Sequence, residues 1–213
     1  MLDIGIMNGS PILAKRWFPQ CTYHGLDISA SMLSQSESEK IDRLFIADLE
    51  TDDLEEVPDG LYDVIVVNHV IEHLRNGLPA LTRLAEKLKP GGHLYVEFPS
   101  VRSLSFPSGD GTLNFQDDPT HVRVYTLAEV ANNLMDSGLK IITAGRPKGI
   151  TRTFLWFFLM IPLQIFNLIT RRRLHARGLT FLLGFSDFVY AVKPPSDKTG
   201  AAGGPTACTP SPD

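Results

Sequence analysis

The residues of this 213-residue chain that could do chemistry lie mainly in its first half, where apolar runs end. A loop with the pattern Asp-x-Gly-x-x-x-Gly spans residues 3–9, and its two glycines let a ligand approach the backbone closely. Asp27 closes the second apolar run, where a carboxylate can accept hydrogen bonds from both hydroxyls of a ribose. The loop and Asp27 together predict a site for a ligand that contains a nucleoside.

The elements that would position these residues alternate between β-branched runs and helical patterns. Strands are predicted at 1–5, 23–26, 44–47, 62–67, 94–98, 140–144 and 188–192, and helices at 10–18, 29–38, 78–88 and 126–135. Thr126 and Glu129 form a capping-box pattern at the start of the last helix. This order predicts an α/β fold with a parallel sheet between helices. Asp27, Asp48 and Asn68 follow three strands and are expected around one site, at the carboxyl ends of those strands.

Five segments occur in a specific order. They are the glycine loop at 3–9, GLDIS at 25–29, ADLE at 47–50, YDVIVVNHVIEHL at 62–74 and LKPGGHLYVEFPS at 88–100. Together they resemble the class I S-adenosylmethionine-dependent methyltransferases, in the branch that acts on small molecules. The resemblance covers residues 1–146 and implies a Rossmann-like, doubly wound seven-stranded sheet, mostly parallel with an antiparallel last strand. The expected methyltransferase domain is 1–193.

The resemblance also implies how S-adenosylmethionine would bind. The implied cofactor-binding residues are Asp3, Gly5, Gly9, Asp27, Ile28, Asp48, Leu49, Asn68 and His69. The first three would border the methionine part of the cofactor. Asp27 would hold the ribose hydroxyls and Asp48 the adenine amino group, and the last two residues of the set would lie beside the sulfonium.

Two features depart from the family's pattern. Met7 stands where the family's loop usually has a glycine, and its side chain costs about 1 kcal/mol or more if the backbone needs a positive φ. The chain also starts inside the first strand, without the helix that normally precedes it, so the expected fold is N-terminally minimal. Both features are expected to affect cofactor affinity. A nicotinamide dinucleotide is the alternative cofactor, but Met7 and Asn8 interrupt the G-x-G-x-x-G pattern that it would require.

Two histidine-containing segments carry further chemistry. Residues 117–126 have the pattern D-x-x-H-x-R-x-[YF]-[ST] of the resembled branch, and His121 is the predicted catalytic base, able to accept a proton from a hydroxyl or amine. The alternative role of His121 is to fix the loop by hydrogen bonds. Residues 69–73 have the spacing H-x-x-E-H, and on a helix His69 and His73 would share a face that could bind zinc with a third ligand. We prefer a site without metal, in which Glu72 and His73 orient the loop.

An apolar and basic insertion, residues 149–186, precedes the last predicted strand. It contains five arginines and no acidic residue, so the remainder of the chain carries a charge of −9. Its apolar run at 154–169 is shorter than the roughly 20 residues of a membrane span. We expect a lid, a dimer face or a peripheral contact with an anionic membrane. Residues 194–213 are expected to form a disordered tail.

Composition bounds the function. A net charge of −4 argues against a general nucleic-acid binder, and two distant cysteines argue against a disulfide scaffold. No signal peptide is found, so we expect a cytoplasmic protein, with membrane association through the insertion. The favoured function is methyl transfer from S-adenosylmethionine to an O, N or C atom of a small or lipid-like molecule. The alternative is a catalytically silent methyltransferase-like module that binds a partner or membrane through residues 150–186.

Overall fold

The computed structural model describes residues 1–6, 9–106, 108, 114–147 and 184–195. Its strands are β1 (Leu2–Ile4), β2 (His24–Asp27), β3 (Arg43–Ile46), β4 (Tyr62–Asn68), β5 (Leu88–Pro99), β6 (Lys140–Gly145) and β7 (Ser186–Val192). Its α-helices are α1 (Ser10–Trp17), α2 (Gln35–Ser38), α3 (Gly77–Lys87) and α4 (Leu127–Asp136), and its 3-10 helices are η1 (Ile71–His73), η2 (Val101–Ser105) and η3 (Phe115–Asp117).

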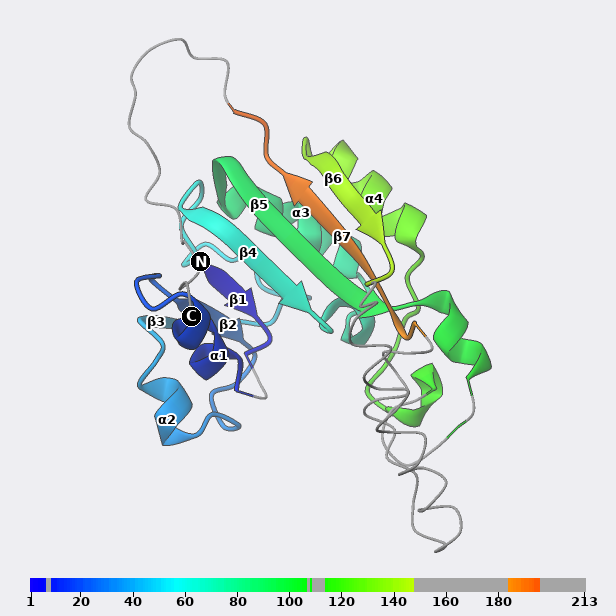
Figure 1. Ribbon diagram of the computed structural model, residues 1–213, viewed down its shortest axis with the longest axis horizontal. Coiled ribbons are helices and arrows are strands. Elements are labelled where there is room, and N and C mark those ends of the chain that lie inside the picture. Colours follow the sequence, from blue (N-terminus) through cyan, green and yellow to red (C-terminus); the bar gives the residue numbers. More distant parts are fainter. Residues whose placement is uncertain (7–8, 107, 109–113, 148–183, 196–213) are drawn as a thin grey trace, which may run out of the picture.

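The strands form one seven-stranded sheet in the order β3-β2-β1-β4-β5-β7-β6 within the described residues (Figure 1). The pairs from β3 across to β5 are parallel, whereas β7 runs antiparallel to both β5 and β6. The predicted seven strands and the antiparallel last strand are therefore confirmed. The chain order reverses between β1 and β4, and ligands of such sheets bind beyond the carboxyl ends of the strands at this switch point.

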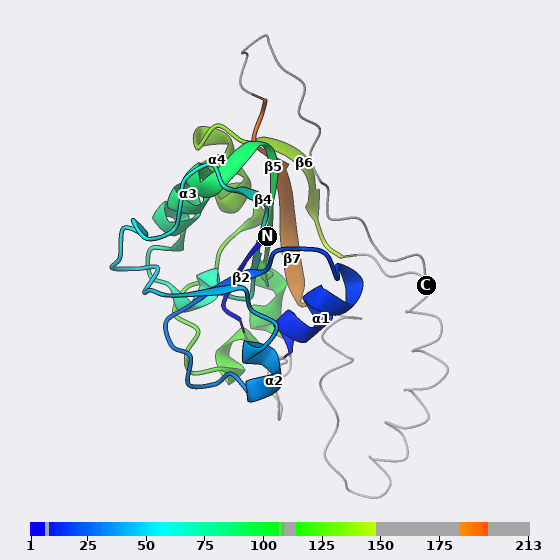
Figure 2. The same cartoon turned by 90° about the vertical axis from the view of Figure 1, so that its left-hand side faces the viewer.

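Helices cover both faces of the sheet, as Figure 2 shows with the sheet seen nearly edge-on: α3 and α4 lie on one side and α1 on the other. Apolar residues of the central strands are buried between these layers, since parallel strands covered on both faces lose nearly all contact with water. Deeply buried residues of β1, β4 and β5 include Leu2, Ile4, Ile65, Val67, Leu94 and Val96. They fix the carboxyl ends of β1, β4 and β5 side by side.

The predicted capping box at the start of α4 is confirmed. Thr126 Oγ1 accepts a hydrogen bond from the Glu129 backbone N–H at 3.1 Å, and Glu129 Oε2 accepts one from the Thr126 N–H at 2.8 Å. Just before it, the buried Tyr125 hydroxyl donates to Leu74 O and accepts from the Gly77 N–H, both at 2.9 Å. The start of α4 is thereby joined to the start of α3.

Two local predictions differ from the structure. The helix predicted at 29–38 is reduced to the single turn of α2, because the serines before it hydrogen-bond locally: Ser29 Oγ accepts from the Ser31 N–H at 3.0 Å. The strand predicted at 94–98 begins six residues earlier, because residues 88–93, directly after the end of α3 at Lys87, also belong to β5. An irregular register between Tyr62 and Val64 accommodates them.

None of the helices in the described ranges is long and apolar enough to cross a membrane. The apolar insertion at 149–186 lies outside the described residues up to position 183, as does most of the expected tail at 194–213. The predictions for both segments therefore stay predictions.

Candidate functional site

The glycine loop after β1 begins at a buried carboxylate. Asp3 is only 6% exposed and accepts a hydrogen bond from the Tyr23 hydroxyl at 2.6 Å. Burial raises the pKa of the Asp3 carboxyl, and the hydrogen bonds from Tyr23 and Ser10 oppose that shift without cancelling it. When ionised, this buried carboxylate favours a cation as its neighbour, since a positive charge offsets the free energy that the carboxylate loses on leaving water.

Gly5 and Gly9 both adopt positive φ angles, 73° and 80°. At Gly5 a Cβ would lie 2.6 Å from Val70 Cγ2, so the backbone after β1 approaches the segment after β4 more closely than a side chain allows. Gly9 caps α1 and its N–H donates to Glu37 Oε1 at 2.8 Å. Met7 lies outside the described residues, so its prediction stays open.

The residues predicted to bind the ribose and the adenine lie at the carboxyl ends of the neighbouring strands β2 and β3. Asp27 Oδ1 accepts from the Ser29 N–H at 3.1 Å, and among the described residues its other oxygen has no hydrogen-bond partner. Ile28 is 66% exposed, an apolar surface beside a free carboxylate oxygen. Asp48 Oδ1 accepts from the Glu50 N–H at 2.8 Å, whereas Leu49 is buried with the core.

The two residues predicted to lie beside the sulfonium stand at the end of β4 and directly after it. Asn68 is its last residue and is exposed, and His69 follows with a φ of 53°. This left-handed conformation breaks the chain direction, so the following helix begins only at Ile71. The zinc alternative, which needs His69 and His73 on one helix face, is therefore contradicted, because His69 is not on the helix.

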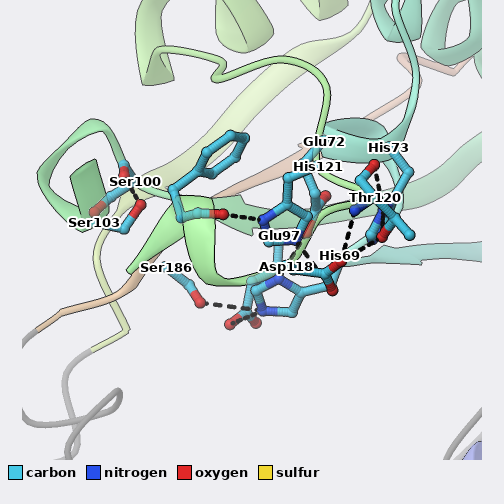
Figure 3. Close-up of polar contacts among 11 residues, drawn as sticks. His69, Glu72, His73, Glu97, Ser100, Ser103, Asp118, Thr120, His121 and Ser186 are labelled. Atoms are coloured by element: carbon cyan, nitrogen blue, oxygen red, sulfur yellow. Dashed lines mark hydrogen bonds and ion pairs between the residues drawn. The ribbon is translucent and has the colours of Figure 1, made fainter. Parts of the chain in front are cut away.

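His69 lies between two carboxylates (Figure 3). Its Nδ1 is 2.9 Å from Glu72 Oε1 and its Nε2 is 3.8 Å from Glu97 Oε1, with Ser186 Oγ 3.2 Å from Nε2. Burial lowers the pKa of this imidazole, but the hydrogen bonds and charges of Glu72 and Glu97 outweigh burial and raise its pKa to about 9. His69 is consequently a cation at neutral pH and donates from both ring nitrogens.

His121 lies in the loop that follows η3, beside the ring of His73 (Figure 3). Its Nδ1 is 2.7 Å from Phe115 O, and its side chain is 6% exposed. The Glu72 carbonyl accepts from the Val122 N–H at 2.9 Å, which ties this loop to η1. The loop-fixing contact that we weighed as the alternative role of His121 is thus present.

The structure brings all nine predicted cofactor residues to the carboxyl-end side of β1 to β4, and His121 to the adjacent loop after β5. Sequence reasoning missed three members of the network around His69. They are Glu97 in β5, Ser186 in β7 and the hydroxyl of Tyr95, which donates to Glu97 Oε2 at 2.6 Å. The available signal was the acidic Glu97 within the predicted strand 94–98, whose other residues are apolar or aromatic.

These residues fit S-adenosylmethionine. The close backbone approach at Gly5 leaves room only for a glycine, and the free oxygen of Asp27 is an acceptor for a ribose hydroxyl. The exposed side chain of Ile28 offers an apolar surface for a base, and the buried Asp3 suits the cationic methionine part. The observed donors, acceptors and exposed apolar surface thus match the parts of this cofactor.

The fold and this edge of the sheet define a Rossmann-like protein with a site for a nucleoside-containing cofactor. The model of the methyltransferase domain family matches residues 1–144, so the chain belongs to this family. Its class is that of the S-adenosylmethionine-dependent methyltransferases, and S-adenosylmethionine is the cofactor of that class.

Individual relatives agree with this assignment. The chain is 35% identical over 102 residues to trans-aconitate 2-methyltransferase of Deinococcus radiodurans, covering 47% of this chain and 38% of that protein. It is 28% identical over 115 residues to aklanonic acid methyltransferase of a Streptomyces species, covering 50% and 51%. The chain thus matches about two fifths to one half of the length of these relatives. In fold it is similar to an S-adenosylmethionine-dependent methyltransferase from Archaeoglobus fulgidus, with a TM-score of 0.59, 20% identity and coverage of 90% and 85%.

Proposed function

We propose that this chain transfers the methyl group of S-adenosylmethionine to a small molecule. The observation that supports this most strongly is the arrangement of the glycine loop and the ends of β2, β3 and β4 around one edge of the sheet. When bound, the cofactor supplies an electrophilic methyl group on a sulfonium. The protein then has to place the acceptor in line and exclude water, which accounts for most of the rate in such reactions.

In this proposal the chain's residues divide the binding work. Asp3 offsets the positive charge of the methionine part, and Gly5 and Gly9 allow the backbone to contact it. Asp27 accepts hydrogen bonds from the ribose. The exposed Ile28 contacts the base together with Asp48 and Leu49, and Asn68 and His69 border the reacting end. Because His69 is cationic at neutral pH, its role is to orient neighbouring carboxylates and not to accept a proton.

We further propose a carboxylate as the acceptor class. Two relatives are named for methylating trans-aconitate and aklanonic acid. A carboxylate needs no base, since it is ionised at neutral pH. For a hydroxyl or amine acceptor, His121 is the candidate base. A lipid-like acceptor stays a second possibility, which rests on the apolar sequence of the insertion at 149–186.

Cofactor binding tests the proposal against the alternative of a catalytically silent module. We expect calorimetric titration of the full chain with S-adenosylhomocysteine to give one site. Asp27→Ala should weaken binding about 10- to 100-fold, the worth of one or two hydrogen bonds to a charged acceptor. Asp63→Ala is the matched control. Asp63 lies near the amino end of β4, away from the carboxyl ends of the strands where the cofactor would bind, and it pairs with Lys89. No heat from wild type at millimolar ligand would contradict the proposal.

Activity then decides the acceptor class. The full chain is incubated with S-adenosylmethionine labelled in its methyl group and with trans-aconitate, and methyl ester formation is measured. Flotation with anionic and neutral liposomes, for wild type and a variant with Arg171, Arg172 and Arg173 replaced by Gln, tests the lipid-like alternative. Salt-sensitive flotation on anionic vesicles without turnover of trans-aconitate would favour the lipid-like acceptor.

A further inference from the structure

Three side chains near the carboxyl ends of β4 and β5 have the composition of a metal site. Glu72 and His73 come from η1, and His121 comes from the loop after η3 (Figure 3). One candidate ligand atom from each residue lies within 4.8 Å of the other two. Two imidazoles and one carboxylate are a common ligand set for zinc-like ions. Ligand distances of about 2.0–2.1 Å to a tetrahedral ion would bring these atoms to about 3.3 Å from one another.

Within the described part of the chain, both histidines make their hydrogen bonds through Nδ1, and neither Nε2 makes one. His121 Nδ1 is 2.7 Å from Phe115 O, and a carbonyl can only accept, so Nδ1 carries the proton. His73 Nδ1 is 3.2 Å from Thr120 O and 2.9 Å from Thr120 Oγ1, and this hydroxyl gives its own proton to Asp118. In both rings the Nε2 lone pair is therefore available. A backbone carbonyl behind the far nitrogen is the usual support of a metal-binding histidine.

Glu72 supplies an independent observation. Its side chain is 1% exposed, and its Oε1 is occupied by His69 Nδ1 at 2.9 Å. Its Oε2 is buried and has no hydrogen-bond partner among the described residues. Buried carboxylate oxygens normally have a partner, because an unpaired one has lost its water without compensation. The carboxylate lies next to the rings of His73 and His121 (Figure 3), so a cation held by those rings would supply the missing partner.

We propose that Glu72 Oε2, His73 Nε2 and His121 Nε2 bind one divalent transition-metal ion of the zinc class. Asp118 is the nearby second carboxylate, with its Oδ2 3.9 Å from His121 Nε2. Its negative charge adds to that of Glu72 in favouring a bound cation. This assignment departs from the metal-free site that we preferred from the sequence. It also differs from the zinc alternative weighed there, in which His69 and His73 would have been the paired ligands.

The proposal gives His121 a different role from that of a catalytic base. A nitrogen bound to a metal cannot accept a proton from a substrate, so the two roles exclude each other. The metal site does not depend on the proposed methyl transfer, because ion binding can be measured without cofactor or acceptor.

Metal binding to the full chain, freed of any affinity tag and stripped with a chelator, tests the proposal. Zn²⁺ or Co²⁺ is added, and bound ion is measured after dialysis. Wild type should retain one ion per chain, with the visible absorption bands of four-coordinate Co²⁺. His73→Gln and Glu72→Gln should weaken binding more than about 10-fold, since even the loss of outer hydrogen-bond partners costs 10- to 100-fold. His93→Gln is the matched control, because that ring stacks on Tyr190 in the sheet.

His121→Gln provides the third ligand test, with circular dichroism as the check of folding. If this variant does not fold, His73→Gln decides, because the hydrogen bonds of His73 are exposed whereas the side chain of His121 is only 6% exposed. Bound Zn²⁺ should also raise the melting temperature of wild type but not that of His73→Gln. Less than stoichiometric binding by wild type, or equal binding by His73→Gln and wild type, would overturn the proposal.

Discussion

The two positive-φ glycines of the cofactor loop offer a matched pair of substitutions. Gly5→Ala and Gly9→Ala both force alanine into the left-handed region, which costs about 1–2 kcal/mol. Only at Gly5 does the new Cβ meet an obstacle, Val70 Cγ2 at 2.6 Å, whereas no described atom lies within 4 Å of a Cβ at Gly9. Because valine is stiff at χ1, we add about 1–3 kcal/mol of overpacking at Gly5 alone. Gly5→Ala should therefore lower the free energy of unfolding by about 2–5 kcal/mol.

Urea unfolding followed by circular dichroism measures the difference between these variants. A gap of about 1–3 kcal/mol corresponds to a difference of about 2–12 °C in melting temperature for a chain of this size. Val70→Ala in the Gly5→Ala background should remove most of the clash and so restore much of the lost stability, giving a favourable coupling energy of about 1–3 kcal/mol between the two substitutions. Equal destabilisation by Gly5→Ala and Gly9→Ala, or an additive double variant, would show that the close approach between this loop and Val70 is not a constraint.

Two further predictions concern buried polar groups. Burial raises the pKa of Asp3 above its ordinary value of 3.8, so the unfolded chain loses this proton at a lower pH than the folded chain. The contribution of Asp3 to stability therefore falls as pH rises from the unfolded-state pKa to the folded-state pKa. Asp3→Asn should therefore be more stable than wild type at pH 7 and not at pH 3.5. If urea unfolding gave the same difference in free energy of unfolding between variant and wild type at both pH values, this prediction would be refuted. Tyr125→Phe removes the hydroxyl that joins Leu74 O and the Gly77 N–H, and it should lower the free energy of unfolding by about 1–3 kcal/mol. An unchanged urea midpoint for this variant would show that the two backbone groups find other partners.

The sequence was sufficient to predict the sheet because strand signals and strand ends are local. The central part of β4, residues 64–67, is wholly apolar. Asp27 is the last residue of β2, and Asp48 follows β3 after one intervening residue. The capping box at Thr126 is also local, since its two partners are three residues apart. Residues whose role depends on nearby sequence could therefore be placed without the structure.

The arrangement around His69 could not be predicted in this way. Its φ is positive without a glycine to signal it, and its partners Glu97 and Ser186 come from two other strands, up to 117 residues away along the chain. The helix face that the H-x-x-E-H spacing would give His69 and His73 is therefore not formed. The structure groups His73 instead with His121, which lies 48 residues later.

The position of β7 between β5 and β6 also has a consequence for the order in which the protein folds during synthesis. Strand β6 pairs only with β7 in the described sheet, yet β7 starts 41 residues after β6 ends. At roughly 5–20 residues per second, the ribosome needs a few seconds to supply it. During that interval the long strand β5 has a free edge on a nascent chain, a surface on which neighbouring chains can pair. Newly made chains therefore pass through a short period in which aggregation competes with completion of the sheet.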